Sequence, residues 1–467
     1  MKYERKGHRV WHLCVLFALL LITANSAAAT ITASLSDYRA KLQLLAPGDV
    51  LLLEAGIYDD SNGYPGLSIY DLNGEPGNPI IITGSDSEPH PVFLGSAGSN
   101  TVRIANSSYV VIRNIEVDSR DRGGDGINGQ DISHHITLEN IAIRGVGSDQ
   151  SIVGISTNRA PVWNWIIRNN LITGAGTGMY LGNSDGKEPF VNGIIENNVI
   201  LDTIGYNMEI KHQIVRPGVP GMPTGQSTTI IRHNVFSKSG NSSGGNFARP
   251  TVLVGHFPPT GSGVSDVYQI YGNFFFNNPS GEPLLQVEGN AVIHNNLFVN
   301  NVGDAILVQP HNDVPKMIRI FSNTVVASGA GIRVSGGSTS FTQKIIGNAV
   351  FAANPINAAD QSDNVTDAYA AAENYLTSPG GDPMTGSLDL YPISGKLLSS
   401  AVDSSSFNTF VDWNLDFNGN ARENGYRGAY SGAGQNPGWL PRLSFKPLAG
   451  STIDILSPTA PTRLVVQ

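Results

Sequence analysis

The sequence predicts an all-β protein, a parallel β-helix in which one chain winds into stacked coils of three short strands. Composition is the first observation: 53 glycines and 27 prolines among 467 residues, with 14% charged residues, disfavour a bundle of α-helices. A repeat is the second observation. One phrase, an alternating β-branched strand, an Asn and a short apolar strand, recurs nine times from VVIRNIEV (110–117) to KIIGNAVF (344–351).

Residues 1–29 are predicted to form a secretory signal peptide. Four basic residues precede an apolar run (13–23), and three alanines (27–29) offer small side chains for cleavage. The run is shorter than the ~20 residues that cross a bilayer, so we expect a secreted or periplasmic protein without membrane insertion. Cys14, the only cysteine, lies in this segment, so we expect no disulfide in the mature chain.

The rest of the chain divides into two predicted parts. Residues 30–358 form the β-helix, which begins with a short cap helix at 35–45, and residues 359–467 form a C-terminal capping region with an irregular tail. The unequal spacing of the phrases indicates coils of constant size joined by loops of variable length. No feature of the sequence predicts an oligomer, so we expect a monomer.

One Asn in each phrase is predicted to belong to a ladder along the β-helix. Asn tolerates the left-handed backbone conformation of a tight corner, and its amide can bond the same group in the next coil. Asn114 and Asn140 sit one position earlier in their phrases, so the first coils are expected to turn differently. The predicted ladder contains Asn170, Asn198, Asn234, Asn273, Asn296 and Asn323.

A third strand follows each phrase, and its side chains are expected to alternate between the interior and the surface. The predicted interior column contains Ile127, Ile155, Met179, Met208, Val252, Leu285, Ile306 and Ile332. The first outward column contains Asn128, Ser156, Tyr180, Glu209, Leu253, Gln286, Leu307 and Arg333. The second outward column contains Gln130, Asn158, Gly182, Lys211, Gly255, Glu288, Gln309 and Ser335.

The middle coils form the predicted functional site, because the outward columns carry their charge there. Glu209, Lys211, His212 and His256 are the predicted catalytic residues. Coils ~4.8 Å apart place such residues nearly on top of one another, so we expect all four in one groove. The predicted substrate contacts are Tyr180, Asn158, Asn183, Arg216, Arg249, Gln309 and His311.

Two long loops, 212–228 and 238–250, attach to these coils and are expected to wall the groove. Loops of that length in a tight repeat are usually functional. They carry basic residues on a chain whose formal net charge is −9. That net charge disfavours nucleic acid and acidic lipid as partners, whereas a local basic set permits an acidic polysaccharide.

These residues also have a purely structural interpretation. Glu209 and Lys211 could form only an exposed ion pair, worth ~0–1 kcal/mol. His212 and His256 could cap strand ends, and the loop arginines could anchor their loops.

The sequence assigns no metal, and calcium stays an open alternative. Calcium takes about six to eight oxygen ligands, and the groove offers four oxygen-bearing side chains without a tight acidic cluster. The histidines near the strand ends lack the spacing of a zinc motif. The oxygen donors are Glu209, Glu288, Asn158 and Gln286.

Two segments at the ends of the repeat resemble a known superfamily. LSDYRAKLQLLAPGDVLLLEAGIY (35–58) is similar to the cap helix, PGD turn and first strands of right-handed parallel β-helix proteins of the pectate-lyase type. DFNGNARENGYRGAY (416–430) resembles the closing D-x-x-G-x-x-R…GA pattern of chondroitinase B-like relatives. The resemblance implies a right-handed coil, on a scaffold that hosts lyases, hydrolases, epimerases and adhesins.

The middle coils resemble chondroitinase B-like and alginate lyases in part. IIENNVILDTIGYNMEIKHQ (194–213) is similar to their coil that ends in E-I-x-S-x-K-S, although Lys211 follows Glu209 by two positions rather than five. LVGHF (253–257) corresponds to their L-R-H-G run, in which His256 matches and the Arg does not.

The expected function is that of a secreted, carbohydrate-active polysaccharide lyase that cleaves an acidic, uronate-containing polymer by β-elimination. This reaction requires a base for the proton beside the sugar carboxylate and a positive group for the developing enolate. A desolvated Lys211 is the expected base, with His212 or His256 as alternate base or proton donor and Arg249 as partner of the carboxylate. The alternatives are a uronate carbon-5 epimerase and a non-catalytic glycan-binding or cell-surface β-helix.

Overall fold

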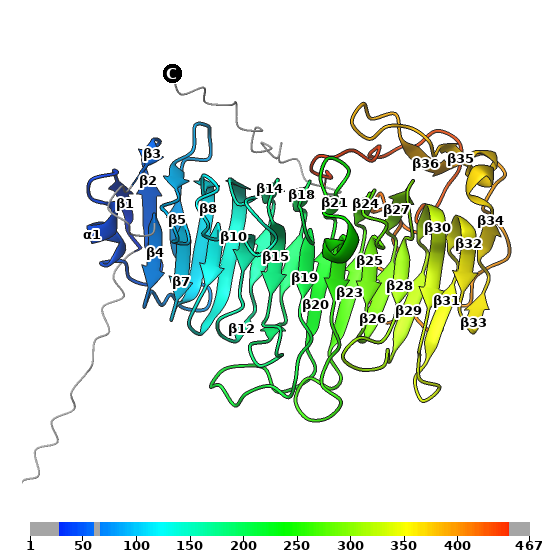
Figure 1. Ribbon diagram of the computed structural model, residues 1–467, viewed down its shortest axis with the longest axis horizontal. Helices are drawn as coiled ribbons and strands as arrows, with labels where there is room; N and C mark the ends of the chain where they lie inside the picture. Colours follow the sequence, from blue (N-terminus) through cyan, green and yellow to red (C-terminus); the bar gives the residue numbers. More distant parts are fainter. Residues whose placement is uncertain (1–27, 60–65, 448–467) are drawn as a thin grey trace, which may run out of the picture.

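The computed structural model describes residues 28–59 and 66–447 and shows one elongated β-helix (Figure 1). A sheet of 34 strands runs from β1 (Thr30–Ala33) to β34 (Val365–Asp367), and the strand pairs within it are parallel. The fold is the right-handed parallel β-helix that was predicted, with the crossover hand that parallel strands prefer. Most of the predicted signal peptide, residues 1–27, lies outside the described residues.

Each coil contributes strands to three faces, and hydrogen bonds join each strand to the coils on either side. The first face contains β1, β2 (Val50–Leu53), β5 (Ile80–Thr83), the first parts of β8 (Ser108–Asp118) and β10 (Ser133–Arg144), β13 (Ile166–Arg168), β17 (Ile194–Glu196), β20 (Thr228–Arg232), β23 (Val267–Tyr271), β26 (Ala291–His294), β29 (Ile318–Phe321), β31 (Gln343–Ile346) and β33 (Asp360–Ser362).

In each coil the chain leaves the first face, turns one corner and enters the second face. It contains β3 (Ile57–Tyr58), β6 (Val92–Leu94), the last parts of β8 and β10, β14 (Leu171–Thr173), β18 (Val199–Leu201), β21 (Val235–Ser237), β24 (Phe274–Phe276), β27 (Leu297–Asn300), the first parts of β30 (Thr324–Val334) and β32 (Ala349–Asn357), and β34.

The third face carries the columns on which the site prediction depends. It contains β4 (Leu67–Tyr70), β7 (Val102–Ala105), β9 (Ile127–Gly129), β11 (Val153–Ser156), β15 (Thr177–Leu181), β19 (Met208–Ile210), β22 (Val252–Val254), β25 (Leu285–Val287), β28 (Ile306–Val308) and the last parts of β30 and β32. Two short strands, β12 (Val162–Trp163) and β16 (Phe190–Val191), pair beside the first face.

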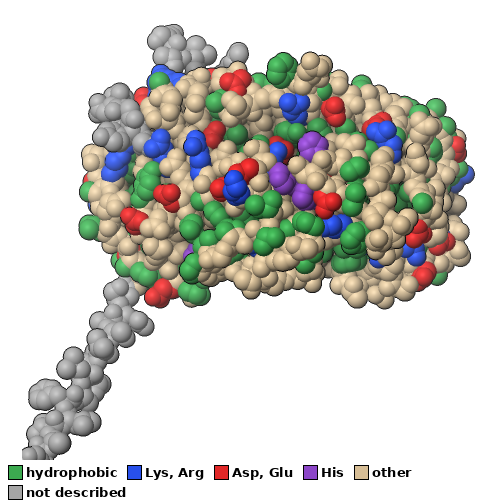
Figure 2. Space-filling model, turned by 60° about the horizontal axis from the view of Figure 1, so that its bottom comes forward, with side chains coloured by type: hydrophobic (Ala, Val, Ile, Leu, Met, Phe, Trp, Pro, Cys, Tyr) green, Lys and Arg blue, Asp and Glu red, His purple; other side chains and the backbone are tan. Residues whose placement is uncertain are grey.

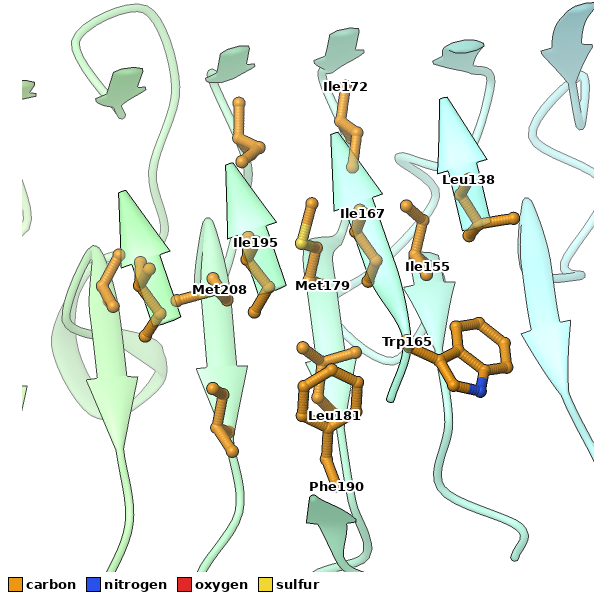
Figure 3. Close-up of a cluster of buried hydrophobic side chains, with 14 of the residues drawn as sticks. Leu138, Ile155, Trp165, Ile167, Ile172, Met179, Leu181, Phe190, Ile195 and Met208 are labelled. Carbon is orange, nitrogen blue, oxygen red and sulfur yellow. The ribbon is translucent and has the colours of Figure 1, made fainter. Parts of the chain in front are cut away.

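The predicted interior column of the third face is confirmed. Ile155 pairs with Met179, and Met179 pairs with Met208, and all three side chains are 0% exposed. Figure 3 shows them beside Ile167 and Ile195 of the first face, so the two faces share one apolar core. Full burial of each such side chain contributes ~1.5–3 kcal/mol. The other members of the column are equally buried: Ile127, Val252, Leu285, Ile306 and Ile332.

The predicted Asn ladder is confirmed at the corner between the first and second faces. Asn170 donates from Nδ2 to Oδ1 of Asn198 at 2.9 Å, and Asn198 donates in the same way to Asn234 at 2.9 Å. The same bond repeats at each later coil and continues past the predicted members through Asn348 to Asn364. The ladder therefore satisfies the buried amides of one corner along most of the body.

The left-handed residue of this corner precedes the ladder Asn, contrary to the prediction that the ladder Asn itself is left-handed. Asn169 and Asn197 have φ values of 57° and 53°. Asn114 and Asn140, with φ values of 55° and 53°, occupy this preceding position in the first coils. This explains why they come one residue early in their phrases, because there the Asn is used for its backbone conformation.

The two ends of the β-helix are covered differently. At the N-terminal end, α1 (Tyr38–Leu42) is the predicted cap helix in a shorter form than 35–45, and its first and last residues are buried. At the C-terminal end the sheet continues beyond the predicted boundary at 358, because β33 and β34 extend the first and second faces to Asp367. Within the described part of the chain, no helix is long and apolar enough to cross a bilayer.

The chain after β34 folds back along the outside of the coils (Figure 1, orange and red). It begins with the 3₁₀ turn η2 (Tyr369–Asn374) and the antiparallel pair β35 (Leu376–Ser378) and β36 (Asp389–Pro392). Farther on, Asn295 donates to the carbonyl of Leu415 at 2.7 Å, and Lys446 donates to the carbonyl of Gly272 at 3.1 Å. The predicted tail is thus fastened to the coils up to 447, and residues 448–467 lie outside the described residues.

Candidate functional site

The outward columns of the third face have the predicted register. Tyr180 pairs with Glu209, Glu209 pairs with Leu253, and Leu253 pairs with Gln286. Backbone bonds from the residues that follow β19, β22, β25 and β28 continue the same register at the strand ends. The second column there contains Lys211, Gly255, Glu288 and Gln309.

A hollow of about 230 Å³ lies over these columns. Figure 2 shows histidines grouped with acidic and basic side chains near the middle of one face of the body. Tyr206, Leu253, Gln286, Gln309 and Asn312 are among the residues that line the hollow. Its titratable and charged lining consists of Glu209, Lys211, His212, Arg249, Glu288 and His311.

Gly255 lies between Lys211 and Glu288 in the second column, where the backbone of the preceding coil leaves no room for a side chain. A Cβ atom there would lie 2.7 Å from Cα of His212 and 2.8 Å from the carbonyl carbon of Lys211. Both are backbone atoms that cannot move aside easily, so the position requires glycine. Lys211 and Glu288, one coil away from Gly255 on either side, both line the hollow.

Lys211 and Glu209 form an ion pair inside the hollow. Nζ of Lys211 lies 2.7 Å from Oε1 of Glu209, and the side chains are 20% and 4% exposed. Burial opposes the charge of Lys211, but the adjacent carboxylate outweighs burial, so the pKa of Lys211 is raised above its ordinary value. The free protein therefore holds Lys211 as an ammonium ion, not as the neutral amine that its expected base role requires.

Tyr180 contacts this ion pair from the preceding coil. Its ring centre lies 5.5 Å from Nζ of Lys211, within the range of a cation–π interaction. Burial raises the pKa of the Tyr180 phenol, although Lys211 acts against the shift. Tyr180 therefore stays a neutral phenol that supports Lys211 from beside the hollow.

His212 and His256 stack as their positions in successive coils predict. Their ring centres are 5.3 Å apart, with 30° between the ring planes. His256 is 7% exposed and does not line the hollow, so only three of the four predicted catalytic residues lie in it. Its Nδ1 is assigned as the donor to the carbonyl of Phe257 at 2.9 Å. Burial, with His256 and Lys211 as further causes, lowers the pKa of His212 below its usual value. His212 is therefore a neutral imidazole near pH 7 and can accept a proton.

Glu288 is the most deeply buried carboxyl group of the hollow, with 1% of the residue exposed. Gln286 donates from Nε2 to Oε1 of Glu288 at 3.3 Å. Burial raises the pKa of Glu288 to about 7. It also raises the pKa of Glu209, although Lys211 counteracts part of that shift. The hollow thus contains a carboxyl group that is partly protonated near neutral pH.

Arg249 reaches the hollow from the loop 238–250. Two buried donors hold its carbonyl oxygen: Nζ of Lys238 at 3.0 Å and Nδ2 of Asn278 at 2.9 Å. The Arg249 guanidinium itself bonds only carbonyl oxygens of its own loop and pairs with no carboxylate among the described residues. It is therefore a positioned cation that can pair with a bound anion.

Other predicted contacts lie elsewhere. Arg216 is buried in an ion pair with Asp266 and serves as a loop anchor, which is the structural interpretation. Asn183 donates to the carbonyl of Asn158 at 3.0 Å, on the two coils before β19, and neither residue lines the hollow. The loop 212–228 contributes only its first residue to the lining, so one of the two predicted walls is absent among the described residues.

Tyr206 and Asn312 line the hollow although the sequence did not predict them. Of these, Tyr206 supplies a titratable group. It lies in the corner before β19, where strand alternation does not hold, so no periodic signal marks it. Glu288 was placed in the second column, but its burial and raised pKa depend on the surrounding loops and could not be read from alternation.

The hollow does not fit a calcium ion. Its two carboxyl groups come with the cations of Lys211 and Arg249, whereas calcium takes about six to eight oxygen ligands. No group of three His, Cys, Asp or Glu side chains suited to a metal occurs within residues 28–59 and 66–447.

No protein-family model matches the sequence, and no curated protein matches it. Several solved structures are similar. An alginate lyase from Paenibacillus sp. str. FPU-7 shows 19% identity and a TM-score of 0.46 over 66% of this chain and 96% of its own. Pectate lyase Pel9A shows 16% identity and a TM-score of 0.45 over 89% of this chain and 97% of its own. The A-module of Azotobacter vinelandii mannuronan C-5 epimerase AlgE6 shows 15% identity and a TM-score of 0.45 over 68% of this chain and 91% of its own. The similarity is one of fold.

Proposed function

We propose that the protein is an exported lyase that cleaves an acidic, uronate-containing polysaccharide by β-elimination in the hollow. The observation that carries the proposal is the meeting of two cations, Lys211 and Arg249, with the neutral imidazole of His212. β-Elimination needs a positive group at the sugar carboxylate and a base at the adjacent carbon. One hollow supplies both kinds of group.

Lys211 and Arg249 bind the uronate carboxylate in this proposal. Arg249 has no carboxylate partner among the described residues, so an incoming carboxylate meets an unneutralised guanidinium. Lys211 stays an ammonium ion beside Glu209 and adds a second positive charge. Removal of the proton at carbon 5 spreads negative charge onto the carboxylate, and both cations stabilise that charge.

His212 is the base in this proposal, the alternate role that the sequence analysis gave it. Its lowered pKa keeps the lone pair free at neutral pH, and its place beside Lys211 brings the imidazole close to the bound carboxylate. His256 supports the ring by stacking behind it. The signal-like residues 1–29 support action outside the cytoplasm.

The test is a screen of the purified protein against alginate, pectate, chondroitin and acidic bacterial exopolysaccharides, with a neutral glucan as control. Elimination leaves a carbon–carbon double bond conjugated to the carboxylate, which absorbs in the ultraviolet. We expect at least one acidic polymer to give this absorbance and the glucan to give none.

Other outcomes of the screen contradict the proposal in distinct ways. Binding of an acidic polymer without any product supports a non-catalytic glycan-binding protein. Inversion at carbon 5 of the uronate, detected by NMR without chain cleavage, supports an epimerase. If no acidic polymer binds and none gives product, the hollow is not a site for acidic glycans.

A further inference from the structure

Elimination also needs a proton for the leaving glycosidic oxygen, and the proposed function leaves that group unassigned. The hollow offers few candidates. Lys211 and Arg249 are held as cations at the carboxylate, and Glu209 is committed to its ion pair. Burial raises the pKa of the Tyr206 phenol, which makes it a weak proton donor. Glu288 lines the same hollow, with no cation bonded to its carboxyl group among the described residues.

Glu288 lies two coils from Lys211 along the third face. It follows β25, whereas Lys211 follows β19, and the coil of β22, with Gly255 in the second column, lies between them. Successive coils are ~4.8 Å apart, so the backbones of the two positions are about 10 Å apart. Both side chains line the same hollow, so a sugar whose carboxylate lies at Lys211 can direct its neighbouring glycosidic bond toward Glu288.

The surroundings of Glu288 favour the protonated carboxyl group. Tyr268 of β23 interacts with Glu288 electrostatically. The titratable and charged groups that line the hollow with Glu288 are Lys211, Glu209, Tyr206, Arg249, His212 and His311. Burial is the largest effect and raises the pKa of Glu288 to about 7, while Gln286 and Lys211 act in the opposite direction. A group with a pKa near the working pH is well suited to give up a proton in catalysis.

We propose that Glu288 is the proton donor to the leaving oxygen, an assignment that rests on the proposed function. His212 takes the proton from carbon 5, and the electron pair of that C–H bond forms the double bond between carbons 4 and 5. The bond from carbon 4 to the glycosidic oxygen breaks, and that oxygen takes the proton of Glu288. Solvent then returns a proton to Glu288 and removes the one on His212.

The experiment compares wild type, Glu288→Gln and the exposed control Glu373→Gln on the acidic polymer that gives product. We expect kcat of Glu288→Gln to fall ~10²–10⁴-fold and that of Glu373→Gln to stay at the wild-type value. The wild-type rate should fall above about pH 7, as Glu288 loses its proton, and this limb should be absent in Glu288→Gln. If Glu288→Gln keeps the wild-type kcat and pH profile, the inference about Glu288 is wrong, whereas the proposed function is unaffected.

A second substrate separates proton donation from a structural role. A uronate with fluoride at carbon 4 eliminates fluoride, which leaves without a proton donor. We expect Glu288→Gln to process it within a few-fold of the wild-type rate, whereas equal losses on both substrates would overturn the inference. If wild type acts on no acidic polymer, the proposed function and this inference both fall.

Discussion

Lys211 and Glu209 form a 2.7 Å ion pair within the hollow, and this pair decides the charge of the lysine. Burial by itself would favour the neutral amine. The carboxylate two residues earlier on the same strand face outweighs that effect, so the pKa of Lys211 is raised rather than lowered. The lysine is thus suited to hold an anion, and the base must be sought elsewhere.

The substitution Glu209→Gln should lower the pKa of Lys211, because burial then acts without the counter-charge. The titration can be followed by NMR of the protein with isotopically methylated lysines. Lys187, which is exposed and paired with Asp185, serves as an internal control whose titration should not change. An unchanged or higher pKa of Lys211 in the variant would show that the ion pair does not set its charge.

Asn234→Ala should destabilise the β-helix strongly, since the buried amide bonds both neighbouring coils. Its Oδ1 accepts from Asn198 and its Nδ2 donates to Asn273, so the substitution leaves buried groups unsatisfied on both sides. Each such group costs ~1–3 kcal/mol. The urea midpoint should fall well below that of Asn241→Ala, a control at an exposed loop position, and equal midpoints would argue against the ladder.

Period-two alternation was sufficient to predict the columns of the third face, including the register of Glu209 over Tyr180. The stacking of His256 with His212, just past the strand ends, was predicted from the spacing of the coils. That success has a physical reason, because each coil is bonded in register to the next and one buried face fixes which side chains point outward. The same rule places the charged side chains of Glu209, Lys211 and Glu288 on the outward side of the third face, where they line the hollow.

Loop paths and charge states could not be predicted in that way. Arg216 and Arg249 both lie in long basic loops, yet one is buried against Asp266 and the other lines the hollow. The difference arises from contacts such as the one that Lys238 makes to the Arg249 carbonyl, which no periodic pattern encodes. The protonation of Lys211 likewise depends on a balance between burial and pairing that spacing alone does not reveal.

Gly255→Ala should disturb the site more than its small size suggests. The added Cβ would lie 2.7 Å from Cα of His212, so the coils must separate locally. The matched substitution Gly244→Ala adds a Cβ with no heavy atom within 4 Å. We expect a lower thermal midpoint and weaker glycan binding for Gly255→Ala only. Wild-type behaviour of both variants would contradict the tight approach of the two coils.

The stability of the protein should rise with pH above neutrality, in part because of Lys446. This residue is 4% exposed, and burial lowers its pKa to about 7, against ~10.4 in an unfolded chain. Between these values the unfolded state binds more protons than the folded state, so the free energy of unfolding increases as pH rises.

Lys446→Met should reduce that increase, as measured by urea unfolding at about pH 7 and about pH 9. Part of the increase should remain, because burial also lowers the pKa of Lys238 to about 8. If the variant keeps the full wild-type increase, Lys446 does not titrate as its burial predicts.

The central claim, that His212 abstracts a proton in a hollow for acidic glycans, is tested most directly by the rate of unsaturated product formation. Wild type and His212→Asn are compared on the acidic polymer that gives product, with circular dichroism and the urea midpoint as checks of folding. Loss of the base should lower kcat ~10²–10⁴-fold in a folded variant. A folded His212→Asn variant that forms product at the wild-type rate would contradict the claim.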